Sequence, residues 1–213
     1  MDHREIERIA LTILAAHGGH TMILYGSHAR GDATLQSDID LLCVRDDGPS
    51  VRDARIVEGI YIDAFIYPET ALKTLDPALL RVLGGVVIRE RDGFGSALLS
   101  RLRELDDRGP APLPDDERQA RTVWSQKMLD RFRGDRGVEA GYRRMYLVVQ
   151  ALEDYFSLRN TWFRGPKEAF PWLLQHDAST HARFERATQP GASDGDFAAL
   201  VHAVYGPHEG MTR

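Results

Sequence analysis

Hydrophobic positions in the first half of the chain change from helical to strand spacing. Ile6, Ile9 and Ile13 recur on one face of a helix, and His17-Gly18-Gly19 supplies a helix end. Short apolar runs of strand length follow, each bounded by glycine, proline or aspartate. These runs are residues 21–25, 39–44 and 86–88. We therefore predict an N-terminal helix followed by a small β-sheet.

Residues 58–67 alternate more strictly than any other segment. Isoleucine and alanine occupy one face of the predicted strand, and Pro68 ends it. The opposite face carries Tyr61, Asp63, Phe65 and Tyr67. Asp63 is thus the one carboxylate of this strand, and its same-face neighbours are large and partly apolar. Helices are predicted after it, over residues 69–82 and 94–105.

The strand signal stops at residues 106–114, where prolines and a glycine oppose regular structure. Beyond this segment the predicted helices span residues 115–132, 138–160, 166–176, 180–187 and 194–204. A mixed pattern followed by an all-helical pattern predicts an α+β protein with two domains. The expected parts are a small mixed sheet with flanking helices (1–105), a linker (106–114) and a helical bundle (115–213).

Composition narrows the class of protein. The chain has 213 residues, of which 43% are hydrophobic, enough for a packed core. Acidic residues outnumber Lys and Arg by 32 to 27, which argues against binding long nucleic acid through bulk positive charge. No run reaches the length of a membrane helix, about 20 apolar residues, and the charged start is unlike a signal peptide. Cys43 is the one cysteine, so we expect a buried thiol and a cytoplasmic protein.

Candidate chemistry gathers around two short motifs. The Gly26-Ser27 turn follows an apolar strand, and such a turn presents backbone N–H groups and a hydroxyl to phosphate oxygens. Asp38 and Asp40 lie two apart at the start of the next strand, so both carboxylates leave the same face. Mg²⁺ binds through one or two carboxylates together with substrate phosphates. The two motifs together predict transfer of a nucleotidyl group.

The same residues resemble a known family. Gly26-Ser27, a spacer and then Asp38-Ile39-Asp40 match the Gly-Ser and Asp-x-Asp signature of the DNA polymerase β-type nucleotidyltransferase superfamily. The resemblance implies a third carboxylate on a later strand, and Asp63 is the candidate. The alternative for Asp63 is a carboxylate that merely faces solvent.

The resemblance also implies a mechanism. Two Mg²⁺ ions held by Asp38, Asp40 and Asp63 would clamp the attacking and leaving oxygens of an in-line displacement at the α-phosphorus of a nucleoside triphosphate. Ser27 and adjacent backbone N–H groups would hold the terminal phosphates. Arg30 either pairs with those phosphates or forms a surface ion pair with Asp32.

The helical half supplies further candidates. The segment 155–167 loosely resembles the helical domain of two-domain bacterial enzymes of the kanamycin type, in which a lysine contacts phosphate. Lys167 is the candidate here, and a solvated lysine is the alternative. Glu153 is the preferred general base, with Glu168 as a second choice and an exposed carboxylate as the alternative for each. We expect the acceptor to bind between the sheet and the helical region.

Three functions compete at this point. The first is transfer of AMP to a hydroxyl of a small acceptor, such as an aminoglycoside-like molecule, with release of pyrophosphate. The second uses the same chemistry on a protein or tRNA, as antitoxin nucleotidyltransferases do. The third is a catalytically inactive nucleotide-binding regulator, which the intact Asp38, Asp40 and Asp63 disfavour. Neither a membrane nor nucleic acid is an expected partner.

Overall fold

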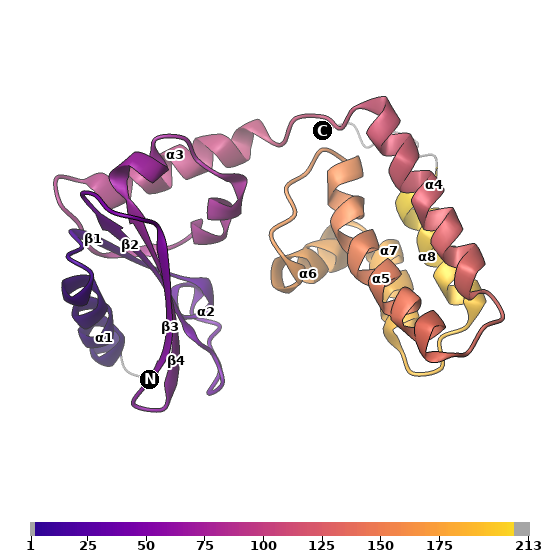
Figure 1. Ribbon diagram of the computed structural model, residues 1–213, viewed down its shortest axis with the longest axis horizontal. Helices are drawn as coiled ribbons and strands as arrows, with labels where there is room; N and C mark the ends of the chain where they lie inside the picture. Colours follow the sequence, from indigo (N-terminus) through magenta and orange to yellow (C-terminus); the bar gives the residue numbers. More distant parts are fainter. Residues whose placement is uncertain (1–2, 207–213) are drawn as a thin grey trace. The chain divides into compact units, whose positions relative to one another are not determined.

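The computed structural model describes residues 3–206. The chain divides into two compact units, Met1–Arg108 and Gly109–Arg213, coloured from indigo to yellow along the sequence in Figure 1. The first unit is a mixed sheet with helices, and the second is built from helices. This architecture confirms the predicted α+β class.

The sheet of the first unit has five strands in the order β3-β4-β2-β1-β5. Its strands are β1 (Thr21–Tyr25), β2 (Ile39–Arg45), β3 (Val51–Val57), β4 (Ile60–Pro68) and β5 (Val86–Arg89). β2 and β4 are parallel, and every other neighbouring pair is antiparallel. The parallel pair lies in the interior of the sheet, with β3 at one edge and β5 at the other.

The two faces of the sheet have different coverings. Helix α1 (His3–Ala16) packs its apolar stripe on the face formed by alternate residues such as Leu24, Leu41 and Ala64. On the opposite face, β1 contacts the 3-10 helix η2 (Pro77–Val82) and helix α3 (Phe94–Arg108). Burial of apolar side chains against α1 fixes which face of each strand points inward. The side chains of Asp40 and Asp63 therefore leave the other face.

Three sequence predictions in this unit need correction. The helix predicted over residues 69–82 is instead two separate 3-10 turns, η1 (Glu69–Leu72) and η2. Pro77 opens the second turn, and its missing N–H interrupts a continuous helix. Strand β3 was not predicted, because its polar and charged residues hide the strand pattern. Helix α3 continues to Arg108 and so includes three residues of the predicted linker.

The second unit contains five helices within the described residues: α4 (Asp115–Phe132), α5 (Val138–Leu158), α6 (Pro166–His176), α7 (Ala178–Thr188) and α8 (Asp194–Tyr205). Its core is a continuous cluster of buried residues from all five helices, including Phe132, Leu147, Leu173, Phe184 and Leu200. Pro171 lies inside α6, which continues to His176. The predicted helical bundle thus has its own core.

A buried carboxylate ties three of these helices together. The Asp154 side chain on α5 is 1% exposed. It accepts hydrogen bonds from the Tyr205 hydroxyl on α8 at 2.6 Å, from Arg121 on α4 at 2.6 Å and from Gln150 at 3.1 Å. Charge-assisted hydrogen bonds of this kind are shorter and stronger than neutral ones. Asp154 is therefore a structural residue of the bundle.

Asp177 caps helix α7. Its carboxylate accepts hydrogen bonds from the Thr180 backbone N–H at 3.0 Å and from the Tyr155 hydroxyl at 2.9 Å. Burial alone raises the pKa of Asp177, but these hydrogen bonds outweigh it and lower the pKa to about 2. The cap is thus held as a carboxylate at neutral pH.

Candidate active site

Strand register brings two of the predicted carboxylates side by side. Asp40 on β2 is the direct partner of Asp63 on the parallel strand β4, and Tyr25 on β1 is the antiparallel partner of Asp40. All three side chains leave the face opposite α1, because their neighbours Ile39, Leu41 and Ala64 belong to the α1 core. The sheet therefore places two hard oxygen ligands on adjacent strands.

The Gly26-Ser27 turn is fitted closely to Asp40. Gly26 has a φ of +71°, which favours glycine, and it opens the short helix α2 (Gly26–Arg30). A Cβ atom at Gly26 would lie 2.1 Å from Asp40 Oδ2. Only a residue without a side chain leaves this carboxylate in place. Ser27 is the next residue along the chain, and it is half-buried. Its hydroxyl therefore belongs to the turn that packs against Asp40.

The Asp63 carboxylate forms an ion pair with an arginine. The Arg52 guanidinium, from strand β3, donates from Nε to one Asp63 oxygen at 2.7 Å and from Nη2 to the other at 2.9 Å. Arg52 also lies 5.2 Å from the centre of the Phe65 ring. The resemblance implies a metal ion at Asp63, and the Arg52 guanidinium places a positive charge there. The Asp63 carboxylate is thus accessible to a cation.

Arg81 is a functional candidate that the sequence prediction missed. Its guanidinium lies 4.2 Å from the Phe65 ring centre, donates to Ala78 O at 2.9 Å and reaches the Tyr67 hydroxyl at 3.4 Å. It also bonds the Tyr25 hydroxyl, whose pKa burial raises to about 12. Arg81 Nε is buried and has no hydrogen-bond partner within residues 3–206. A continuous helix over residues 69–82 would give the Arg81 side chain another direction than the 3-10 helix η2 does. The helix prediction therefore did not reveal that Arg81 lies over Phe65.

The third predicted ligand and Arg30 are less closely engaged. Asp38 lies just before β2 and is half-buried. Its carboxylate does not join Asp40 and Asp63 in a tight three-residue group within the described residues. Arg30 Nε lies 3.3 Å from Asp32, so the surface ion pair named as its alternative is present. His28, on the same short helix as Arg30, has a buried Nε2 without a hydrogen-bond partner within residues 3–206.

The tight group of potential ligands in the described part of the chain lies elsewhere. His20, Asp46 and Glu69 have ligand atoms within 4.8 Å of one another. Asp46 and Glu69 follow the ends of β2 and β4, whereas Asp40 lies near the start of β2. Arg91 pairs with both carboxylates, at 3.0 Å for Glu69. Burial and Arg91 lower the pKa of His20. The group is thus an ion-pair cluster at the opposite end of the strands from Asp40.

Comparisons with known proteins identify the family of this chain. The model of the nucleotidyltransferase domain family matches residues 6–80, which include the Gly26-Ser27 turn, Asp40 and Asp63. A Methanocaldococcus jannaschii protein, described by its name as a candidate protein adenylyltransferase, is 30% identical over 115 residues. That match covers 46% of this chain and 78% of the relative. This chain belongs to the nucleotidyltransferase family. The predicted membership of the DNA polymerase β-type superfamily is confirmed.

A solved structure also matches this nucleotidyltransferase. It is the crystal structure of a nucleotidyltransferase-like protein from Exiguobacterium sibiricum 255-15, which is 14% identical and aligns with a TM-score of 0.44. The alignment covers 95% of this chain and 73% of that protein.

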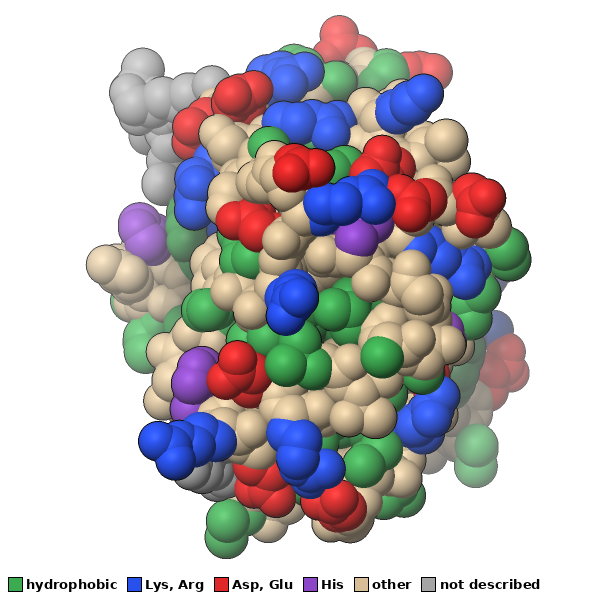
Figure 2. Space-filling view, turned by 90° about the vertical axis from the view of Figure 1, so that its left-hand side faces the viewer, with side chains coloured by type: hydrophobic (Ala, Val, Ile, Leu, Met, Phe, Trp, Pro, Cys, Tyr) green, Lys and Arg blue, Asp and Glu red, His purple; other side chains and the backbone are tan. Residues whose placement is uncertain are grey.

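The surface of the nucleotidyltransferase shows no single-sign patch on the face in Figure 2, where basic and acidic side chains are interspersed. The face shown therefore carries no basic stripe of the kind that binds long nucleic acid. Within residues 3–206 no helix is both long and apolar enough to cross a membrane. Cys43 is fully buried, and burial raises its thiol pKa to about 11, so the expected buried thiol is confirmed.

The predicted residues of the helical unit are both exposed. Glu153 lies on α5, next to the buried Asp154, and its own side chain faces solvent. Lys167 is the second residue of α6, after Gly165 and Pro166. Arg164 lies 3.8 Å from Glu168, so the second-choice base is in an ion pair. The roles of Glu153 and Lys167 stay predictions.

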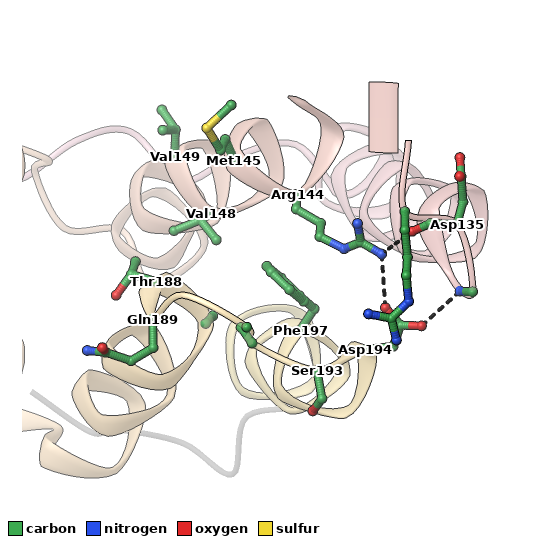
Figure 3. Close-up of a pocket in the computed structure, with 15 residues that line it drawn as sticks. Asp135, Arg144, Met145, Val148, Val149, Thr188, Gln189, Ser193, Asp194 and Phe197 are labelled. Carbon is green, nitrogen blue, oxygen red and sulfur yellow. Dashed lines mark hydrogen bonds and ion pairs between the residues drawn. The ribbon is translucent and has the colours of Figure 1, made fainter. Parts of the chain in front are cut away.

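The helical unit has a pocket of its own, with a volume of about 780 Å³ (Figure 3). Met145, Val148 and Phe197 contribute an apolar wall, and Arg144 and Asp194 form its polar end (Figure 3). Arg144 donates to Phe132 O at 2.9 Å and to Asp194 at 3.3 Å. Its guanidinium therefore anchors the turn between α4 and α5. Neither Glu153 nor Lys167 lines this pocket.

Proposed function

We propose that this nucleotidyltransferase transfers AMP from a nucleoside triphosphate to a hydroxyl of a small acceptor, such as an aminoglycoside-like molecule. The observation that supports it best is the direct pairing of Asp40 with Asp63 next to the Gly26-Ser27 turn. Carboxylates on adjacent strands beside a phosphate-binding turn suit an electrophile that carries phosphates and metal.

The bonds that change are few. The acceptor oxygen attacks the α-phosphorus, the bond to the β-phosphate bridging oxygen breaks, and pyrophosphate leaves. Mg²⁺ ions held by Asp38, Asp40 and Asp63 would supply charge stabilisation at the attacking and leaving oxygens. Ser27 and the backbone of the turn bind the terminal phosphates in this proposal, and Arg30 assists by exchanging Asp32 for phosphate.

The acceptor proton needs a base. Glu153 is our candidate in the helical unit, and Lys167 is the candidate for phosphate binding. Glu153→Gln should then lower turnover while the affinity for the nucleotide stays unchanged, because a base acts on the acceptor. Lys167→Ala should instead weaken nucleotide binding. Turnover and calorimetric nucleotide binding, measured on both variants, test the two roles. If both variants behave like the wild type, neither Glu153 nor Lys167 takes part in the reaction.

A protein acceptor is the second candidate. It is favoured by the name of the Methanocaldococcus jannaschii relative, which describes a protein adenylyltransferase. The match to that relative covers 46% of this chain, so much of the chain lies outside it. A helical unit with its own core favours a self-contained acceptor site and hence a small acceptor.

One experiment tests the function and separates the acceptors. The full chain is incubated with Mg²⁺ and each nucleoside triphosphate, first with hydroxylated small molecules and then with cell-extract proteins, and products are analysed by mass spectrometry. We expect a gain of AMP by a small molecule. Transfer of AMP to a protein, and to none of the small molecules, would favour the protein acceptor. Asp40→Asn should abolish either transfer and keep the native circular dichroism, and wild-type turnover of that variant would refute the site.

A further inference from the structure

The pair formed by Arg52 and Asp63 joins an exposed cation to a half-buried anion. The Arg52 side chain is 61% exposed, whereas that of Asp63 is 19% exposed. Arg52 lies on the edge strand β3, opposite Phe65 and diagonal to Asp63. Asp63 lies on an interior strand, fixed between β3 and β2. The arginine can therefore swing into solvent, while the carboxylate keeps its place beside Asp40.

Arg81 offers a contrast on the same face. Its guanidinium lies over the same Phe65 ring, at 4.2 Å from the ring centre, and it is bound to Ala78 O and to two tyrosine hydroxyls. Its guanidinium is thus anchored by several groups. Arg52 has Asp63 as its ion-pair partner and a distant ring contact. Of the two arginines, Arg52 is held by fewer contacts and is the more easily displaced.

We propose that Arg52 is a positioning residue that holds Asp63 when no metal is bound and exchanges with a divalent metal ion during the reaction cycle. This inference rests on the proposed role of Asp63. Both Asp63 oxygens are occupied by the guanidinium, so a metal ion and the bidentate Arg52 compete for the same lone pairs. Arg52 therefore lowers the metal affinity of Asp63 and fixes the direction of its carboxylate until substrate and metal arrive.

The expected size of the competition follows from electrostatics. A unit positive charge about 5 Å from a divalent ion in screened water changes the affinity about five-fold at physiological salt. Arg52→Gln should thus tighten metal binding about five-fold, and the effect should shrink as salt rises. Arg52→Lys keeps the charge but loses the planar fork, so it should bind metal with an affinity between the two.

The test is a titration of the full chain with Mn²⁺ alone, followed by electron paramagnetic resonance of the free ion. Arg55→Gln is the matched control, since Arg55 lies on the same strand and pairs with Asp53 on the opposite face. That control should leave Mn²⁺ affinity unchanged. In a second readout, the Mg²⁺ concentration for half-maximal transfer should fall about five-fold in Arg52→Gln and stay unchanged in Arg55→Gln.

The outcomes separate this inference from the proposed function. If Asp63→Asn weakens Mn²⁺ binding but Arg52→Gln binds like the wild type, the exchange is refuted and the metal site stands. If Asp63→Asn also binds like the wild type, both the metal role of Asp63 and the exchange are wrong. If Arg52→Gln and Arg55→Gln both bind Mn²⁺ more tightly than the wild type, and to the same extent, the change in net charge explains the effect. This result would refute a specific role for Arg52.

Discussion

Gly26→Ala should damage transfer far more than it damages the fold. The new Cβ atom would lie 2.1 Å from Asp40 Oδ2 and 3.0 Å from its Cγ. Carbon–oxygen contacts of side chains are normally longer than about 3 Å, so the Asp40 carboxylate must move by about 1 Å. Such a movement changes the Asp40 side-chain rotamer and leaves the strand in place. The displaced group is, however, the one proposed to bind metal, and a misplacement of about 1 Å can lower a rate about 100-fold.

The chain supplies a matched control for backbone strain. Gly31 ends the same short helix with a φ of +81°, and a Cβ there would meet nothing within 4 Å. A non-glycine residue in the left-handed region costs about 1–2 kcal/mol. Gly26→Ala and Gly31→Ala should therefore lose similar free energies of unfolding, and only the first should lose most of its activity.

The assay combines single-turnover AMP transfer with urea unfolding of both variants. We expect a rate about 100-fold lower for Gly26→Ala than for Gly31→Ala, with unfolding free energies within about 1 kcal/mol of each other. Equal transfer rates in the two variants would show that the contact between Gly26 and Asp40 does not matter for the reaction. A large loss of stability in Gly26→Ala alone would show that Asp40 resists the movement.

Two predictions concern the helical unit. Asp154→Ala leaves the buried Tyr205 hydroxyl unpaired and removes one of the two carboxylate partners of Arg121, which keeps Glu117. The substitution should lower the free energy of unfolding by about 3 kcal/mol. Urea unfolding followed by tryptophan fluorescence measures this unit, because all three tryptophans lie in it, and a loss under about 1 kcal/mol would contradict the buried network. Asp177 has a folded pKa of about 2, below its ordinary value of 3.8, so its contribution is present above pH 4 and lost as pH falls toward 2. Partial exposure limits it to about 1 kcal/mol, and Asp177→Asn should remove that part of the acid sensitivity in thermal melts between pH 5 and 2.

The faces of the site strands could be predicted from sequence, but their pairing could not. Alternation in residues 58–67 placed Asp63 opposite the apolar face, and β4 has that burial pattern. The partner Asp40 depends on β2 and β4 being parallel neighbours. That arrangement depends on β3, whose Arg52, Asp53 and Arg55 lack any apolar alternation. Edge strands use such charges to avoid further pairing, and the same charges hide the strand from a hydrophobicity pattern.

The arginines around Phe65 escaped prediction for a different reason. Arg52 belongs to the unpredicted strand, and Arg81 belongs to a segment predicted as a regular helix. Apolar spacing in residues 69–82 fits a helix, but Pro77 restarts the chain there as a 3-10 turn. The direction of a side chain on such a turn follows from tertiary packing against β1. Sequence periodicity does not contain that information.

The parallel ladder between β2 and β4 has a consequence for substitution at the site. Partners run without a break from Ile39 with Ile62 to Arg45 with Pro68, so backbone hydrogen bonds fix the separation of the two aspartate Cα atoms at about the usual strand spacing of 4.8 Å. Side-chain length and rotamer then set the gap between the carboxylates. Glutamate at position 40 or 63 would add a methylene to a span that the backbone does not lengthen, and at position 40 it would press on Gly26. A replacement that preserves charge is therefore a geometric change here, and aspartate is required for its length as much as for its acidity.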